Sequence, residues 1–165
     1  TLPRGRIILS PDRIAETVVD LCKDAGMPQD PKANWLAADI AQLGDRFAKL
    51  VSVSYLRLRL DVINTNACRK FHIDTITSRL ICTYRGTGTQ YGIARNGQQP
   101  QRVFTAQTGA PILLRGSLWP AQPSSGLVHR SPPIEGTGET RLVLVLDPVE
   151  DPEHHAAIWG DHRLS

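Results

Sequence analysis

The hydrophobic period of the sequence changes near residue 51, and this change limits the folds that the chain can adopt. Before this point, apolar residues recur at intervals of three and four, which is the period of an amphipathic helix. One such stripe covers residues 14–22 and a second covers residues 36–50. Polar residues beside a proline at 10–12 and at 30–31 are typical helix starts. We therefore predict two N-terminal helices with apolar stripes that face a core.

After residue 51 the period becomes two. In residues 56–62, leucines alternate with charged residues, which indicates a half-buried strand. Further strands are predicted at residues 78–84, 102–106, 111–116, 126–129 and 141–147. Clusters of glycine and proline separate these runs and mark turns. Many short strands with such connections predict a mainly β, antiparallel sandwich or barrel, with the two helices packed outside it.

The length of 165 residues and the hydrophobic fraction of 41% fit one globular domain with a core of its own. We assign residues 1–148 to this single domain, including its helical N-terminal part. Residues 149–165 are polar and are expected to form a C-terminal tail. No apolar run approaches the roughly 18 residues that a membrane-spanning helix needs, so we expect no membrane partner.

The cysteine pattern and the distribution of charge indicate the cellular compartment and the kind of partner to expect. The three cysteines, Cys22, Cys68 and Cys82, are an odd number at irregular spacing. This pattern is not that of a disulfide framework and favours a reducing compartment, the cytoplasm. Basic residues are scattered and aromatic residues make up only 5% of the chain. A nucleic-acid partner is therefore not expected.

A candidate metal site begins with His72 and Asp74, which lie between two predicted strands. His129 lies at the end of another predicted strand. Two imidazoles and one carboxylate that face one point are the ligand set of non-haem Fe(II), and they leave coordination positions open. The triplet around His72 alone is also compatible with a hydrogen-bonded pair without a metal. With His129 added, the pattern predicts that His72, Asp74 and His129 bind Fe(II).

Arg141 opens the most apolar predicted strand, twelve residues after His129. A buried guanidinium needs an anion, and its fork geometry matches a carboxylate. Arg141 could therefore bind a small-molecule cosubstrate with a carboxylate group. The alternative is an arginine at a strand start that pairs with Glu139 or Asp74.

The order of these residues resembles the double-stranded β-helix (jelly-roll) Fe(II)/2-oxoglutarate oxygenases. More closely, "CRKFHIDTITSRLICTYRGTGTQYG", "GAPILLRGSLWP" and "GLVHRSPPIEGTGETRLVLVLD" resemble the DUF1826 family of bacterial proteins, over roughly residues 50–148. The resemblance implies a jelly roll with N-terminal helices outside it. It also implies that the triad holds Fe(II) and that Arg141 pairs with the distal carboxylate of 2-oxoglutarate.

One position departs from the oxygenase pattern. Many of these enzymes have Ser or Thr two residues after the arginine, where this chain has Val143. The second anchor for the cosubstrate carboxylate is then expected from Tyr84 or Thr140. The DUF1826 family has no established activity and is linked with zinc-responsive genes and metal chaperones. The resemblance thus implies an oxygenase, or alternatively a non-catalytic zinc-binding protein that buffers, senses or delivers the metal.

Other residues leave further alternatives open. A Cys68 thiolate that turned inward would complete a tetrahedral zinc site with the triad. A jelly-roll binding module without turnover is a third function. The tail histidines His154, His155 and His162 are expected to be solvated. We predict that residues 86–92, "GTGTQYG", form a turn at the mouth of the site, and that Trp119 and Pro120 line the mouth or anchor a loop. The substrate is not specified by the sequence.

Overall fold

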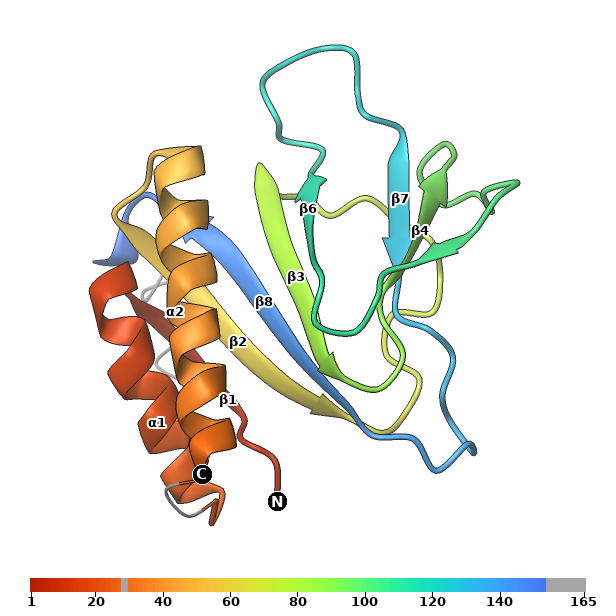
Figure 1. Ribbon diagram of the computed structural model, residues 1–165. Coiled ribbons are helices and arrows are strands. Elements are labelled where there is room, and N and C mark those ends of the chain that lie inside the picture. The colour runs from red at the N-terminus through yellow and green to blue at the C-terminus, as the bar shows by residue number, and fades with distance from the viewer. Residues whose placement is uncertain (28–29, 154–165) are drawn as a thin grey trace. The chain divides into compact units, whose positions relative to one another are not determined.

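The computed structural model describes residues 1–27 and 30–153 (Figure 1). Two helices follow a short 3₁₀ turn, η1 (Pro11–Arg13), and these are α1 (Ile14–Asp24) and α2 (Pro31–Val51). The strands in this part of the chain are β1 (Gly5–Leu9), β2 (Tyr55–Ile63), β3 (Ser78–Arg85), β4 (Gln90–Ile93), β5 (Phe104–Thr105), β6 (Pro111–Arg115), β7 (Leu127–Arg130) and β8 (Arg141–Val149). The predicted tail histidines lie outside the described residues, as does the tail from residue 154 onward.

The chain divides into two compact units. The first contains residues 1–61 and the chain from residue 145 onward, and the second contains residues 62–144. Strand β8 contributes its first residues to the second unit and its remaining residues to the first. The assignment of residues 1–148 to one domain stays a prediction.

In the first unit, α1 and α2 lie side by side (Figure 1). The side chain of Asp30 accepts a hydrogen bond from the Lys32 amide at 2.9 Å, which caps the start of α2. Ile14, Ile40 and Phe47 are almost fully buried, so both predicted helices and their apolar stripes are confirmed. The stripe ends before Leu50, which is exposed in the last turn of α2.

The strands of the first unit pack against these helices. β1 pairs with β2 in an antiparallel register that places Ile7 opposite Leu58. Leu58 and its neighbours on the same face of β2 are fully buried, as the alternation predicted. Gly44 of α2 lies so close to Ile14 and Leu56 that a Cβ atom would collide with Ile14. The prediction missed β1, because its five residues show no clear period.

The second unit is built from antiparallel strand pairs. β3 pairs with β6, with Arg79 opposite Leu114 and Ile81 opposite Ile112. β4 pairs on one side with β5 and on the other with β7, which gives a three-stranded sheet in the order β5-β4-β7. Figure 1 shows β4 and β7 side by side. Because opposite residues of an antiparallel pair point to the same face, this register determines which side chains meet.

The mainly β, antiparallel architecture with two helices is confirmed, whereas some predicted boundaries are wrong. The expected turn at residues 86–92 contains the start of β4 at Gln90. The strand expected at residues 102–106 shortens to β5, because it pairs with β4 over only two positions. Across residues 1–27 and 30–153, the structure contains no helix with the length and apolar content for crossing a bilayer.

Candidate metal centre

His72 lies in the connection between β2 and β3, where a backbone contact orients its ring. Its Nδ1 atom lies 2.8 Å from the carbonyl oxygen of Lys70. Because a carbonyl oxygen only accepts, Nδ1 carries the hydrogen and donates it. In the neutral ring the lone pair is then on Nε2, which lies 3.3 Å from Asp74 Oδ1. Histidine ligands of metals commonly donate their other N–H group to a carbonyl in this way.

His129 lies in β7 directly opposite His72. The two residues form an isolated antiparallel bridge in which each backbone N–H donates to the other's carbonyl oxygen at 3.0 Å. Opposite residues project to the same face, and the two imidazole centroids are 4.5 Å apart. His129 is buried, with 5% of its surface exposed. Residues far apart in the sequence are therefore brought together by the backbone itself.

Asp74 lies between the two histidines and the Arg79 guanidinium. Its Oδ2 atom is 3.1 Å from His129 Nε2 and 2.8 Å from Arg79 Nη1. Arg79 is in β3, so this contact ties the Asp74 carboxylate to the first strand after it. The sequence analysis missed Arg79. Its spacing from Asp74 is unremarkable, and its role depends on the path of the chain between the two residues.

The three side chains fit one metal ion. Ligand atoms of His72, Asp74 and His129 all lie within 4.8 Å of one another. Ligands at right angles around a metal, each about 2.1 Å from it, are roughly 3 Å apart. The two distances from Asp74 to the histidines, 3.3 Å and 3.1 Å, are close to that separation. Two imidazoles and one carboxylate on one side of an ion are the ligand set predicted from the sequence.

Charge interactions within the cluster shift the pKa values of its members. Burial raises the pKa of Asp74, but hydrogen bonds from His129 and His72 and the positive charge of Arg79 outweigh burial. The pKa of Asp74 is therefore far below its usual range, and the group is an anion. The hydrogen bond to Asp74 raises the pKa of His72, against the opposing effect of burial. A metal ion and a proton would thus compete for His72 beside the anionic Asp74 carboxylate.

A tight loop supports Asp74 from the side. The Ser117 amide donates to the Asp74 carbonyl oxygen at 2.9 Å, and the Leu118 amide donates to that of Ile76 at 3.0 Å. A Cβ atom on Gly116 would collide with the carbonyl oxygens of Ile76 and Asp74. Only glycine allows these two backbone segments to approach so closely.

Arg141 is 1% exposed at the start of β8. Its Nε donates to the Thr87 carbonyl oxygen at 2.7 Å, and its Nη2 is 3.4 Å from Thr83 Oγ1. Burial lowers the pKa of Arg141, and the charge of Glu139 opposes that effect. Within residues 1–27 and 30–153, Arg141 forms no ion pair with a carboxylate, and Asp74 pairs with Arg79 instead.

Glu139 contacts the same turn. Its carboxylate accepts hydrogen bonds from the Thr87 amide at 2.7 Å and from the Thr87 hydroxyl at 3.0 Å. These bonds from Thr87 lower the pKa of Glu139. Residues at the start of the predicted glycine-rich turn therefore hold Arg141 and Glu139 in place.

The second cosubstrate anchor that was expected at Tyr84 or Thr140 stays a prediction. The hydroxyl that the structure places beside Arg141 is that of Thr83, which the sequence analysis missed. Neighbouring residues of a strand point to opposite faces, so Tyr84 and Thr83 project to opposite sides of β3. No local pattern in the sequence identifies Thr83, because the pairing of β3 with β6 decides which face of β3 meets the site. Val143 is buried, with 4% of its surface exposed.

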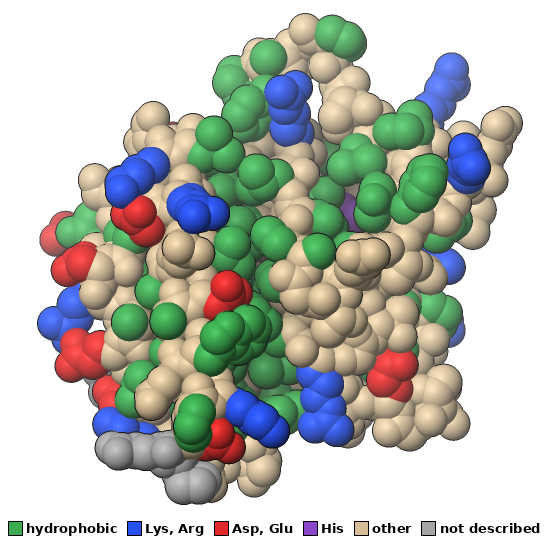
Figure 2. Space-filling view, viewed as in Figure 1, with side chains coloured by type: hydrophobic (Ala, Val, Ile, Leu, Met, Phe, Trp, Pro, Cys, Tyr) green, Lys and Arg blue, Asp and Glu red, His purple; other side chains and the backbone are tan. Residues whose placement is uncertain are grey.

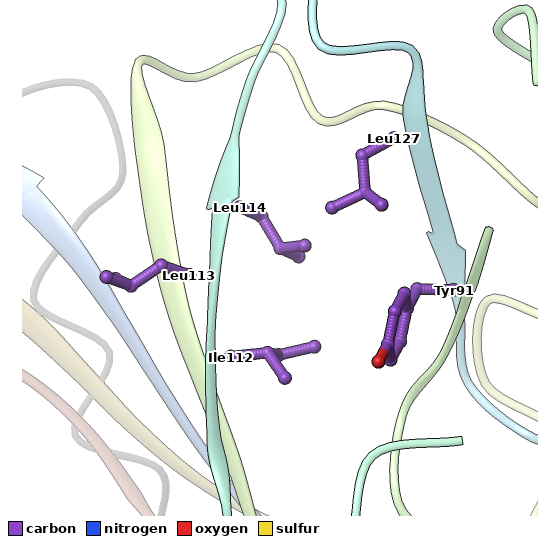
Figure 3. Close-up of a pocket in the computed structure, with 5 residues that line it drawn as sticks. All are labelled: Tyr91, Ile112, Leu113, Leu114 and Leu127. Atoms are coloured by element: carbon purple, nitrogen blue, oxygen red, sulfur yellow. The ribbon is translucent and has the colours of Figure 1, made fainter. Parts of the chain in front are cut away.

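Next to the metal cluster, β6 and β7 border an apolar pocket of about 200 Å³ (Figure 3). Its lining residues are Tyr91, Ile112, Leu113, Leu114 and Leu127. In Figure 3 the side chains of Tyr91, Ile112, Leu114 and Leu127 point into one space, while that of Leu113 points away. Figure 2 shows a histidine surface recessed between β6 and β7 and surrounded by hydrophobic side chains.

Other sequence candidates lie apart from the cluster. Cys68 is exposed and does not belong to the group of metal-binding side chains that the structure describes. Trp119 is half-buried under the guanidinium of Arg115, whose central carbon is 5.0 Å from the ring centroid. Pro120 is exposed. These positions are compatible with either expected role of the Trp119–Pro120 segment.

The fold and the cluster together define a mainly β protein with a candidate site for one metal ion. The DUF1826 family, described as "Protein of unknown function (DUF1826)", matches residues 1–147. The chain therefore belongs to the DUF1826 family. No curated protein matches its sequence. Among solved structures it is similar to a Pseudomonas putida prolyl-4-hydroxylase, with 10% sequence identity and a TM-score of 0.44, over 90% of this chain and 89% of that chain.

Proposed function

We propose that this protein is a non-haem Fe(II)- and 2-oxoglutarate-dependent oxygenase. The observation that carries the proposal is the convergence of His72, Asp74 and His129, whose ligand atoms lie within 4.8 Å of one another. A two-histidine, one-carboxylate set with open positions is the ligand set of non-haem Fe(II) oxygenases. When bound, Fe(II) supplies oxidation by O₂ coupled to decarboxylation of the cosubstrate.

The strand arrangement of the second unit supports a double-stranded β-helix. The backbone of His72 pairs with His129 at the edge of β7, so the chain at residue 72 extends the sheet β5-β4-β7 by one bridge at the candidate metal site. A separate antiparallel pair, β3 and β6, presents Ile112 and Leu114 toward Tyr91 and Leu127 of that sheet (Figure 3). Two antiparallel layers that face each other across a site are what a jelly roll provides.

Arg141 supports 2-oxoglutarate as the cosubstrate. Arg79 and Thr83 project to the same face of β3, and their Cα atoms are separated by roughly 13 Å along the strand. Arg79 contacts Asp74 and Thr83 contacts Arg141, so the metal cluster and Arg141 share this face. A dicarboxylate held at the metal through one end would direct its other carboxylate toward Arg141, which forms no ion pair among the described residues.

The protein's own residues would orient the reactants and exclude water. His72, with its Nδ1 hydrogen bonded to Lys70, offers Nε2 to the metal, and Arg79 holds the Asp74 carboxylate. We further propose a cytoplasmic location, because Cys22, Cys68 and Cys82 are all free thiols. The small-molecule cosubstrate is then the expected partner, without nucleic acid or membrane.

A non-catalytic zinc-binding protein is the second candidate. Two observations favour it: Val143 offers no hydroxyl beside Arg141, and Arg141 already donates to Thr87 within the protein. A zinc buffer or carrier needs the triad but has no need for a buried guanidinium. The two candidates therefore differ in what Arg141 binds.

Replacement of Arg141 tests the choice. Truncating one partner of a buried charge pair costs about 2–5 kcal/mol, which is roughly thirtyfold or more in affinity. Arg141→Ala should leave Fe(II) binding intact and weaken 2-oxoglutarate binding by that factor, measured by calorimetry without oxygen. Arg141→Lys, which keeps the charge but loses the fork, should restore part of the affinity. Arg85→Ala, at the exposed end of β3, is the control.

The unmodified protein should then form succinate from 2-oxoglutarate once Fe(II) and oxygen are added. If it binds Fe(II) or zinc but binds no 2-oxoglutarate, the oxygenase proposal fails and the zinc-binding function replaces it.

A further inference from the structure

The apolar pocket beside the triad has a position that the register determines. Tyr91 is paired with His129 across β4 and β7, and Leu127 is two residues before His129 in the same strand. All three side chains therefore project to one face of the sheet. On the opposite layer, Leu114 is paired with Arg79, the residue that holds Asp74. The pocket is thus bounded by neighbours of His129 and by a neighbour of Arg79, which contacts Asp74.

The pocket and Arg141 lie toward opposite ends of β3. Arg141 reaches Thr83, near the end of the strand, whereas Leu114 is paired with Arg79, near its start. Leu127 is paired with Ile93, the last residue of β4. Since a short turn joins the end of β3 to the start of β4, Leu127 also lies at the end away from Arg141. The charged and the apolar ends of the site are therefore separate.

The lining of the pocket selects by polarity. Four of the five lining residues are aliphatic, and the Tyr91 hydroxyl is the one side-chain polar group among them. The Tyr91 ring is held by Phe104, with ring centroids 5.6 Å apart and an angle of 25° between the planes. A charged group in this partly open space would lose part of its hydration without a compensating partner.

The size of the pocket suits one small apolar group. An apolar cavity of about 150 Å³ in another protein binds benzene. At about 200 Å³, this pocket has room for a group of the size of a substituted benzene ring or a branched aliphatic side chain. Aromatic and aliphatic lining with few polar groups is typical of small-molecule sites.

We propose that this pocket binds an uncharged, apolar group of the substrate next to the metal, so that the substrate class is a molecule or side chain with an aromatic or branched aliphatic part. This inference rests on the proposed oxygenase function, because the triad gives the pocket its significance. The charged cosubstrate occupies the Arg141 end, and the apolar group occupies the end formed by Leu114 and Leu127.

The test uses the full chain without oxygen, with Mn²⁺ in place of Fe(II) and toluene as the probe. Mn²⁺ broadens the NMR lines of nearby nuclei steeply with distance, so toluene in the pocket should show line broadening that zinc does not cause. Benzylammonium, which has the same ring and a positive charge that neither the metal nor Arg141 attracts, should bind about tenfold or more weakly.

Two variants and one control locate the probe. Leu127→Trp and Leu114→Trp fill the pocket and should reduce the broadening of toluene at least about tenfold, provided that circular dichroism shows the native fold. Leu127 is only half-buried, whereas Leu114 is buried, so the fold should tolerate a larger side chain better at Leu127. Leu113→Trp is the control, because the Leu113 side chain points away from the pocket and is 52% exposed (Figure 3).

The outcomes separate the two proposals. Mn²⁺ binding that needs Asp74, together with no broadening of toluene or equal broadening in Leu127→Trp, overturns the pocket assignment and leaves the metal site standing. Absence of any metal binding overturns the proposed function, whatever toluene does. Benzylammonium that binds as tightly as toluene also overturns the apolar specificity.

Discussion

Asp74 is the residue on which the cluster depends, because three nitrogen-bearing side chains meet at its carboxylate. His72, His129 and Arg79 all lie within 3.3 Å of one of its oxygens. In the absence of a metal, the Arg79 guanidinium and the protonated form of His72 balance its charge. With a metal bound, one carboxylate oxygen becomes a ligand while Arg79 keeps the group oriented. A neutral side chain of the same shape would satisfy neither state.

Asp74→Asn should therefore abolish most metal binding. Changes to residues that merely support ligands cost about 10–100-fold in metal affinity, so loss of the only anionic ligand should cost at least about 100-fold. Titration with Fe(II) or zinc under anaerobic conditions measures this loss. Asp20→Asn, on the exposed surface of α1, is the matched control. Equal metal affinity in both variants would mean that the metal binds elsewhere.

We expect His72 to make metal binding depend on pH. Its pKa is raised above the ordinary value of about 6.5, first by the hydrogen bond to Asp74. The ion pair with Asp74 then stabilises the metal-free fold fully below that ordinary value, and its contribution is lost as pH rises through the raised pKa. The pH dependence of metal binding should run the other way and favour higher pH, because the metal must displace the proton on His72.

We expect metal affinity to increase as pH rises through the raised pKa of His72 and to level off above it. Binding below that pKa should release a proton, which calorimetry in buffers of different ionisation enthalpy detects. His72→Gln removes the titrating group and should flatten this dependence. A flat pH profile in the unmodified protein would show that His72 is not a ligand.

The residues of the site were predictable to different degrees. His72, Asp74 and His129 could be named because ligand chemistry restricts the residue types and their spacing follows strand ends. Arg79 and Thr83 could not be named, because their roles depend on which face of β3 meets the site. That choice follows from the register between β3 and β6, which no local pattern in the sequence specifies.

Among the elements, the connection from β6 into the loop after it packs closely against the backbone beside the site. Gly116 follows β6 and contacts the backbone of the segment that carries Asp74. The neighbouring residues Ser117 and Leu118 donate hydrogen bonds to the same segment. This loop therefore sets the position of Asp74 through its backbone, independently of any side chain.

Gly116→Ala should displace that segment. The added methyl group meets backbone oxygens, which cannot rotate away, so we expect a loss of about 1–3 kcal/mol in the free energy of unfolding. Metal affinity should fall as well, since Asp74 would shift. Denaturant unfolding and metal titration measure the two effects. Ser117→Ala, at an exposed neighbour whose amide bond remains, should change neither, and an unchanged Gly116→Ala variant would contradict the close approach.

Elements whose hydrophobic pattern continues over many residues were predicted well, and short elements were not. The stripes of α1 and α2 and the alternation of β2 extend over enough residues to identify each element. β1 and β4 have five and four residues, and their strand structure depends on pairing with β2 and β7. Gln90 and Tyr91 were assigned to a turn because the glycines around them dominate the local pattern.

At the scale of the whole molecule, the three candidate metal-binding side chains belong to the second unit, residues 62–144. The first unit has its own buried residues in α1, α2 and β2. A ligand that binds only the folded state stabilises it by about 2.7 kcal/mol at a concentration 100 times its dissociation constant. That stabilisation should be strongest where the metal contacts the chain.

Metal loading should therefore raise the thermal unfolding midpoint and slow amide hydrogen exchange at residues 72–74 and 127–130 first. Mass-resolved hydrogen exchange with and without zinc measures the pattern. Asp74→Asn, treated in the same way, should show no change. Slowing that was greatest in α1 and α2 would place the metal outside the triad.

The paired backbone hydrogen bonds between His72 and His129 bear on whether the fold depends on a metal. In a zinc finger the ion itself closes the chain, so its removal unfolds the domain. Here the polypeptide has already brought the two imidazoles together, and the entropy of closing that long loop is lost during folding. If the triad binds a metal as proposed, the protein should therefore keep its fold when that ion is removed or exchanged for another.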